Sequence, residues 1–123
     1  MFLFGRIMPD IAGYCGIIDN KAYSQYSITN DHHNRMVHNY IGNLSNYYKG
    51  SYRLRFFSYI AGGFSRNING QLSKITKETG ISGSALNVEN FIRLIEKNRQ
   101  CPISHQKFGE LFSCGRQILS ADF

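Results

Sequence analysis

The sequence predicts an α/β fold in which a mixed sheet is flanked by helices. Stretches of strand length, apolar or rich in aromatic residues, alternate with segments whose apolar residues recur at helical spacing. The 123 residues, 42% of them hydrophobic, suffice for one core, so we expect a single domain over residues 1–123. No apolar run approaches the ~20 residues that a membrane span needs. Three cysteines without CxxC spacing predict a reduced, cytoplasmic protein.

The first 23 residues are expected to form strands joined by a turn. Asp10 stands at the opening of one predicted strand and Asp19 near the end of the next. We expect a tight antiparallel turn through Ala12-Gly13 to bring these two carboxylates together. Because side chains at i and i+2 of a strand share a face, Asp19 and Lys21 should lie on the same side of the sheet.

The remaining elements follow from periodicity and from turn residues. Residues 30–48 are predicted to form a helix that is capped at Asn30-Asp31 and ends at Gly50. Its inward face is expected to carry Met36, Val37, Tyr40, Ile41, Leu44 and Tyr48. Further on we expect a strand over 52–60, a turn at Gly62-Gly63, a helix over 69–79, a strand over 84–88, a helix over 89–98 with Phe91, Ile92 and Ile95 inward, and a helix over 104–112 opened by Pro102.

Three charged side chains of the first segment are candidates for a catalytic site. Asp10, Asp19 and Lys21, if they converge, supply two oxygen ligands and one ammonium, which metal-assisted phosphodiester hydrolysis requires. Charges at the end of an apolar strand are costly unless they are paired or bind a metal. The alternative is a simple ion pair of Asp19 with Lys21, with Asp10 as a turn residue. A net charge of +6 suits a polyanionic partner such as nucleic acid.

Several segments resemble the cleavage domain of FokI-like type IIS restriction endonucleases, a branch of the PD-(D/E)xK nucleases. The resemblance is carried by Pro9-Asp10 and by Ile17 to Ser24, which reads Ile-Ile-Asp-Asn-Lys-Ala-Tyr-Ser. It continues through Leu3–Arg6, Phe57–Phe64, Gln71-Leu72, Gly83–Glu89 and Phe108–Ile118. The similarity thus covers roughly residues 3 to 118 and implies the restriction-endonuclease-like core of that superfamily.

The resemblance also implies a reaction and a set of roles. Asp10 and Asp19, with the backbone carbonyl of Asn20, would ligate Mg²⁺, for which Mn²⁺ is a substitute. Lys21 would position or deprotonate the attacking water, and double-stranded DNA would be hydrolysed to 5′-phosphate and 3′-hydroxyl ends. Two alternatives remain open: a catalytically inactive, nuclease-derived subunit that binds DNA or protein, and a nuclease that acts on junctions or RNA.

The sequence departs from the family pattern in two places. The residues before Pro9 are too few for the helix that related nucleases place there, which predicts an N-terminally truncated domain or a subunit completed by a partner. That partner would be a second nuclease chain or a DNA-recognition subunit. Asn34 and His38 stand where homodimerising members carry an acidic residue and an arginine.

Five basic residues are candidates for contacts with DNA phosphates, with a solvated charged surface as the alternative: Arg53 and Arg55 on one strand face, and Arg66, Lys74 and Lys77 near the glycine turn. Three histidines, His32, His33 and His38, are interpreted as surface or capping residues and not as a metal trio. His33 and His38 diverge on a helix, and no carboxylate is spaced to complete a site.

Overall fold

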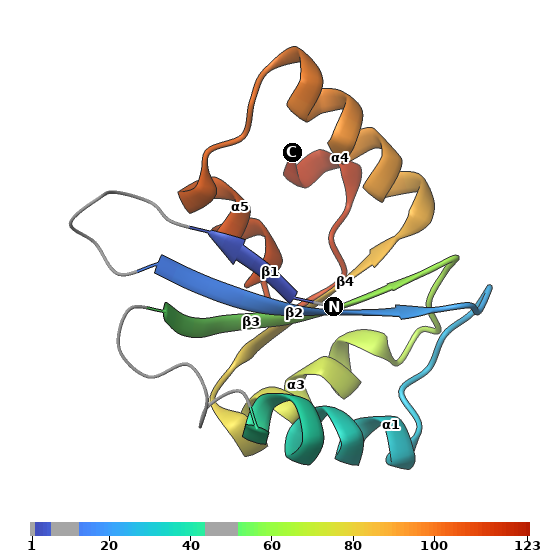
Figure 1. Cartoon of the computed structure of the whole chain (residues 1–123). Helices are drawn as coiled ribbons and strands as arrows, with labels where there is room; N and C mark the ends of the chain where they lie inside the picture. Colours follow the sequence, from blue (N-terminus) through green and yellow to red (C-terminus); the bar gives the residue numbers. More distant parts are fainter. Residues whose placement is uncertain (1, 6–12, 44–51) are drawn as a thin grey trace.

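The computed structural model describes residues 2–5, 13–43 and 52–123 of the chain (Figure 1). In chain order the elements are β1 (Phe2–Gly5), β2 (Gly13–Lys21), α1 (Asn30–Asn34), the π-helix η1 (Arg35–Ile41), β3 (Tyr52–Ala61), α3 (Ile68–Thr79), β4 (Ser82–Asn87), α4 (Val88–Gln100), α5 (His105–Phe112) and the 3₁₀ helix η2 (Ser120–Asp122). Among these described residues no helix is long and apolar enough to cross a membrane.

A four-stranded mixed sheet with the order β1-β2-β3-β4 lies at the centre. β1 is antiparallel to β2, whereas β2, β3 and β4 are parallel. The expected turn through Ala12-Gly13 is wrong at Gly13, which begins β2 and pairs with Tyr52. Gly13 to Ile18 are all buried. Helices cover both faces of the parallel part of the sheet, so this strand is a continuous run of buried residues and contains no turn. Asp10 lies outside the described residues.

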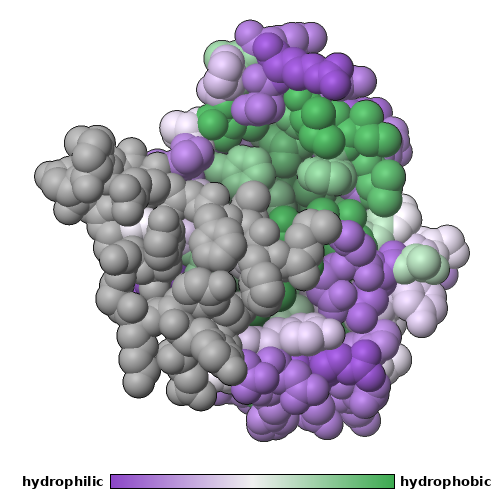
Figure 2. Space-filling view, in the orientation of Figure 1, coloured by the Kyte–Doolittle hydropathy of each residue, from purple (hydrophilic) through white to green (hydrophobic). Residues whose placement is uncertain are grey.

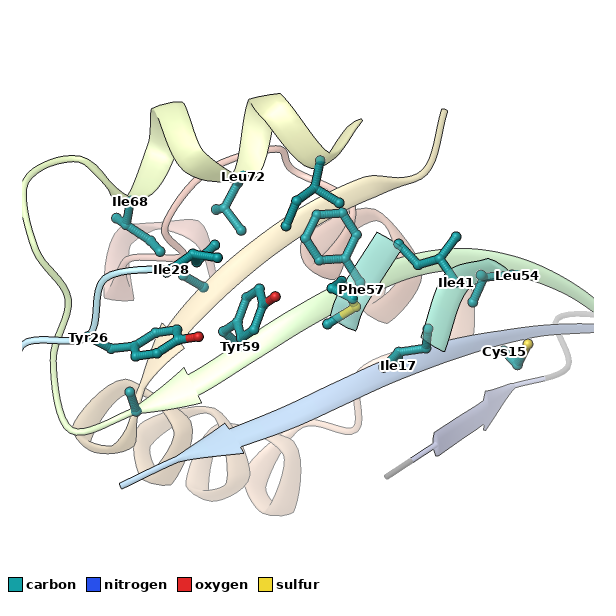
Figure 3. Packing of buried hydrophobic residues seen from close by; sticks show 14 residues of the cluster. Cys15, Ile17, Tyr26, Ile28, Ile41, Leu54, Phe57, Tyr59, Ile68 and Leu72 are labelled. Carbon is teal, nitrogen blue, oxygen red and sulfur yellow. The ribbon is translucent and has the colours of Figure 1, made fainter. Parts of the chain in front are cut away.

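Helices cover both faces of the sheet and enclose two hydrophobic cores (Figure 1). The first core lies between the sheet and the helices η1 and α3, and contains Ile17, Ile41, Phe57 and Leu72 (Figure 3). The second core lies on the opposite face against α4 and α5. Successive residues of β2 alternate between the two cores, as the period of two in a strand requires. The predicted α/β core with a mixed sheet flanked by helices is therefore confirmed.

Two glycines make this packing sterically feasible. A methyl group at Gly16 of β2 would collide with the ring of Phe56 on the neighbouring strand, and one at Gly83 of β4 would collide with the ring of Phe57. Both rings are fully buried. The large aromatic residues of β3 therefore fill space that glycine leaves free on the strands at either side.

The predicted helix over 30–48 is confirmed as far as the structure describes it. It starts with α1 and continues as η1, and its N-cap is Thr29, whose Oγ1 accepts a hydrogen bond from the His32 amide at 3.1 Å. The cap was expected at Asn30-Asp31, but Asn30 already belongs to the helix. Met36 and Ile41 are buried in the first core as predicted, and Val37 and Tyr40 pack against it. Leu44, Tyr48 and Gly50 lie outside the described residues.

The inward face predicted for α4 is partly wrong. Leu94 is buried, whereas Ile92 and Ile95 are 51% and 41% exposed, and Phe91 packs against the second core. β4 leads directly into α4, and the Asn87 side chain caps the helix by accepting a hydrogen bond from the Asn90 amide. This fixed start sets the rotation of α4, so that the stripe through Phe91 and Leu94 faces the sheet.

Partly accessible apolar side chains border the second core. Phe91, Ile103, Phe108, Cys114 and Phe123 pack against it while remaining partly accessible. On the face shown in Figure 2, apolar side chains gather below α4, in the upper half of the view, and hydrophilic ones cover α1. The helix over 104–112 is observed as α5, with Ser104 as its N-cap.

Candidate active site

The carboxyl end of β2 carries the predicted pair of charges on one face of the sheet. Asp19 Oδ2 lies 3.1 Å from Lys21 Nζ, and the two side chains are only 19% and 13% exposed. Their common face is thus as predicted, and the intervening Asn20 is exposed. Whether Asp10 joins them stays a prediction, because Asp10 lies outside the described residues.

The pair lies on the side of the sheet that holds the first core. Asp19 is the register partner of Tyr59 on β3, whose side chain is completely buried. The Tyr59 hydroxyl is buried and has no hydrogen-bond partner among the described residues. Burial, and then the neighbouring Tyr26 and Asp19, raise the pKa of Tyr59, so that the phenol stays protonated at neutral pH. The carboxylate of Asp19 therefore borders an apolar, aromatic wall.

The oxygen chemistry of this pair fits a magnesium ion in part. Lys21 contacts Oδ2 of Asp19, and Oδ1 accepts no hydrogen bond from any residue that the structure describes. A carboxylate oxygen free of protein donors at a partly accessible strand end is a ligand that Mg²⁺ accepts, since this ion takes few protein ligands and keeps several waters. Across the described ranges no three His, Cys, Asp or Glu side chains form a metal-binding group.

The loop that follows Lys21 is fixed against the turn between β3 and α3. Gly62 donates its amide to the Tyr23 carbonyl at 2.9 Å, and Tyr26 donates its amide to the Gly63 carbonyl at 2.9 Å. A side chain at Gly63 would collide with the carbonyl oxygen of Ser24. The paired glycines at the predicted turn therefore allow two backbone segments to touch, which holds the end of β2 in place.

Gln71 of α3 secures the same loop from its other side. Its Oε1 accepts a hydrogen bond from the Ile28 amide at 2.9 Å, and its Nε2 donates one to Ser27 Oγ at 2.8 Å. One amide side chain thus satisfies a backbone donor and a hydroxyl of a segment that lies 43 and 44 positions away in sequence. The loop after Lys21 is therefore tied to two elements of the first-core face.

His32 is a residue of this region that sequence reasoning treated only as surface or capping. Its Nδ1 lies 2.8 Å from the hydroxyl of Tyr26, which is 2% exposed. Burial, followed by the positive charges of Lys21 and Arg35, lowers the pKa of His32, so that the imidazole is neutral at pH 7. The signal in the sequence was weak, because only the fold brings residues 26 and 32 to the end of β2.

The other two histidines are placed elsewhere. His33 Nε2 lies 2.9 Å from Glu78 Oε1 and so links α1 to the end of α3. His38 and Asn34 are exposed on the helix that α1 and η1 form.

The five basic candidates lie in three places. Arg53 is exposed, but Arg55 is the extra residue of a bulge on β3, and its guanidinium lies 5.3 Å above the Tyr14 ring, on the second-core face. Arg55 therefore faces away from Asp19. Arg66 is exposed at the glycine turn. Lys74 and Lys77 are exposed on α3, with Lys77 in its last turn, and a shared phosphate-binding cluster with Arg66 stays a prediction.

Comparison with known proteins assigns this fold to a class. The restriction endonuclease FokI is 19% identical, with a TM-score of 0.76 over 95% of this chain and 22% of the FokI chain. FokI bound to DNA is 20% identical, with a TM-score of 0.77 over the same shares. These likenesses show that the chain has the α/β fold of the matching part of FokI, and the chain spans about a fifth of the FokI chain. No curated protein shows significant sequence similarity.

The family itself is given by a match to the model described as the FokI cleavage domain, over residues 7–119. This range contains the Asp19–Lys21 pair, the loop that follows it and both hydrophobic cores. The chain belongs to the FokI cleavage-domain family, as the resemblance implied.

Proposed function

We propose that the chain is a Mg²⁺-dependent DNA endonuclease cleavage domain, or subunit, of a type IIS-like restriction enzyme. It would hydrolyse phosphodiester bonds of double-stranded DNA to 5′-phosphate and 3′-hydroxyl ends. The observation that carries the proposal is the Asp19–Lys21 pair at 3.1 Å at the end of a central strand, in a chain of this family. The net charge of +6 supports a polyanionic substrate.

Each residue has a role in this proposal that follows from its chemistry. Asp19, with Asp10 and the Asn20 carbonyl, would hold Mg²⁺, which when bound supplies a Lewis acid for the phosphoryl oxygens and acidifies water. Lys21 orients the attacking water and offsets the negative charge that grows on the phosphoryl group. Asp19 in turn holds the ammonium in place, and the aromatic wall of Tyr26 and Tyr59 limits water access on the core side.

The test is the nicking of supercoiled plasmid DNA by the purified chain with Mg²⁺ or Mn²⁺. We expect cleavage by the unmodified protein, and a loss of at least about a hundredfold in Asp19→Asn and in Lys21→Ala. Two exposed positions on α4 supply matched controls: Glu89→Gln and Lys97→Ala should cleave as the unmodified protein does. Adding EDTA should stop cleavage in every active sample.

The outcomes separate the proposal from its alternatives. The nuclease assignment is refuted if the protein never cuts DNA with either metal, even after a DNA-recognition subunit has been added. Binding of duplex DNA without uptake of Mg²⁺ or Mn²⁺ in calorimetry would instead identify an inactive, nuclease-derived binding subunit. Preferential cutting of junctions or RNA would identify the structure-specific alternative.

A further inference from the structure

A hydrogen bond beside the active site has no role in the reaction described above. The Tyr26 hydroxyl and His32 Nδ1 are 2.8 Å apart. The Tyr26 ring is held by aromatic neighbours on several sides, with centroid distances of 5.5 Å to Tyr23, 5.5 Å to Tyr59 and 6.3 Å to Phe64. Figure 3 shows Tyr26 and Tyr59 next to each other in the first core. The hydroxyl is therefore a fixed point to which the imidazole is tied.

The location of the imidazole proton follows from this contact. The buried Tyr26 hydroxyl carries one proton, and His32 Nδ1 is its one hydrogen-bond partner among the residues described. Donation from the hydroxyl to Nδ1 satisfies both groups, whereas the reverse direction would leave the hydroxyl proton without an acceptor. Burial and the charge of Asp19 raise the pKa of Tyr26, which keeps the hydroxyl a donor. The neutral ring of His32 then carries its proton on Nε2.

Nε2 of His32 is available for a contact with a molecule outside the protein. Nδ1 and Nε2 lie on different edges of the ring, so that with Nδ1 turned to Tyr26 the Nε2–H bond is directed away from that hydroxyl. Nε2 has no hydrogen-bond partner in the described part of the chain, and His32 is partly exposed. The Tyr26 ring packs beside that of Tyr59, the register partner of Asp19, which brings His32 to the side of the sheet that carries the Asp19–Lys21 pair.

We propose that His32 binds a backbone phosphate of the DNA substrate as a neutral Nε2–H donor, oriented by the Tyr26 hydroxyl. The proposal rests on the proposed nuclease function and adds to it a substrate-binding residue. A neutral donor differs from Lys or Arg in one measurable respect. It displaces no counterion from DNA, so it contributes affinity without contributing to the salt dependence of binding.

Two substitutions of His32 distinguish the role of Nδ1 from that of Nε2. His32→Asn keeps an amide near Nδ1 and loses the group at Nε2, whereas His32→Gln places an amide N–H near Nε2 and loses the acceptor for Tyr26. Binding of a fluorescent DNA duplex is measured by anisotropy in EDTA with the full chain. We expect His32→Asn to weaken binding about ten- to a hundredfold, as for a lost hydrogen bond to a charged group. His32→Gln should stay within about threefold of the unmodified protein.

The salt dependence supplies a readout that a structural role would not move. The slope of log K against log salt should be the same in His32→Asn and in the unmodified protein, whereas loss of a cationic contact lowers the slope by about one. Equal affinity in all three proteins overturns the proposal. So does weak binding confined to His32→Gln, because the imidazole would then act only by supporting Tyr26.

A further variant keeps the test decisive if His32→Asn does not fold. Tyr26→Phe retains the imidazole and frees its tautomer, and we expect DNA binding to weaken about two- to fivefold. Unchanged binding overturns the proposal. A protein that binds DNA through His32 but never cuts it refutes the nuclease function alone, and a cleaving protein insensitive to these variants refutes the phosphate contact alone.

Discussion

The Asp19–Lys21 pair is predicted to couple more strongly than any exposed ion pair of the protein. The perturbation is a double-mutant cycle with Asp19→Asn, Lys21→Met and the double variant, measured without divalent metal. Each single change leaves one charge unpaired in a site where the side chains are 19% and 13% exposed. The double change removes both charges, so it should be less destabilising than the sum of the two single changes.

The size of the coupling free energy follows from the distance between the two charges and from their burial. At 3.1 Å and an effective dielectric constant of roughly 20, the gross attraction is about 5 kcal/mol. Solvent that reaches these partly accessible side chains screens this attraction, whereas the desolvation cost of each single charge cancels in the cycle. We therefore expect a coupling free energy of about 2 kcal/mol, and a cost of similar size for each single variant.

The assay is urea denaturation of the four proteins, followed by circular dichroism, with the free energy of unfolding extrapolated to water. The matched control is the pair Arg93–Glu89 on α4, which has a similar length of 2.9 Å but is 55% and 73% exposed. The same cycle at that pair should yield at most about 0.5 kcal/mol.

One outcome would refute this reasoning. If the coupling between Asp19 and Lys21 is as small as that of the control pair, the ammonium does not hold the carboxylate, and the geometry of the proposed active site is wrong. If the coupling is large but all single variants keep full nuclease activity, the pair is structural only.

Three further predictions concern packing, pH and the loop after Lys21. Gly16→Ala should destabilise the fold by about 1–3 kcal/mol in urea denaturation, because its methyl would collide with a buried ring, whereas Gly70→Ala, which meets nothing within 4 Å, should stabilise α3 by up to about 1 kcal/mol. Arg116 lowers the pKa of the Asp122 carboxyl from 3.8 to about 2, so this ion pair stabilises the folded state above about pH 4 and the contribution is lost as the pH falls through about 2. Asp122→Asn should remove this contribution, so that the stability of the variant depends less on pH below about 4 when unfolding is followed after pH jumps. An unchanged dependence of stability on pH would contradict the prediction. Gln71→Leu removes two hydrogen bonds to the loop and should speed amide hydrogen exchange there, while the protection of β3 stays the same.

Local patterns in the sequence were sufficient to predict most of the helices and strands. β3 and α5 were expected within one residue of their observed ends, because alternation, turn glycines and the Ser104 cap act over a few neighbours. The common face of Asp19 and Lys21 also followed from strand geometry alone. The resemblance carried by these residues correctly indicated the family.

Long-range packing decided what local pattern could not. Gly13 was expected to turn the chain but lies in a strand, because β3 supplies its partner from 39 positions away. The inward face of α4 was misassigned because its rotation depends on the direct connection to β4. Arg53 and Arg55 were expected to share one face of a strand, but the sequence could not tell which core that face borders; the guanidinium of Arg55 lies over the Tyr14 ring, on the face of the second core.

The sequence by itself determined which residues alternate, which segments form helices, and which charged side chains share the end of β2. Only the tertiary structure decided that Tyr26 meets His32 and that Gln71 holds the loop next to them. The physical reason is that strand and helix periods are set by bonds between near neighbours. A contact between separate loops and helices depends instead on how all the buried side chains fill the space between the sheet and its helices.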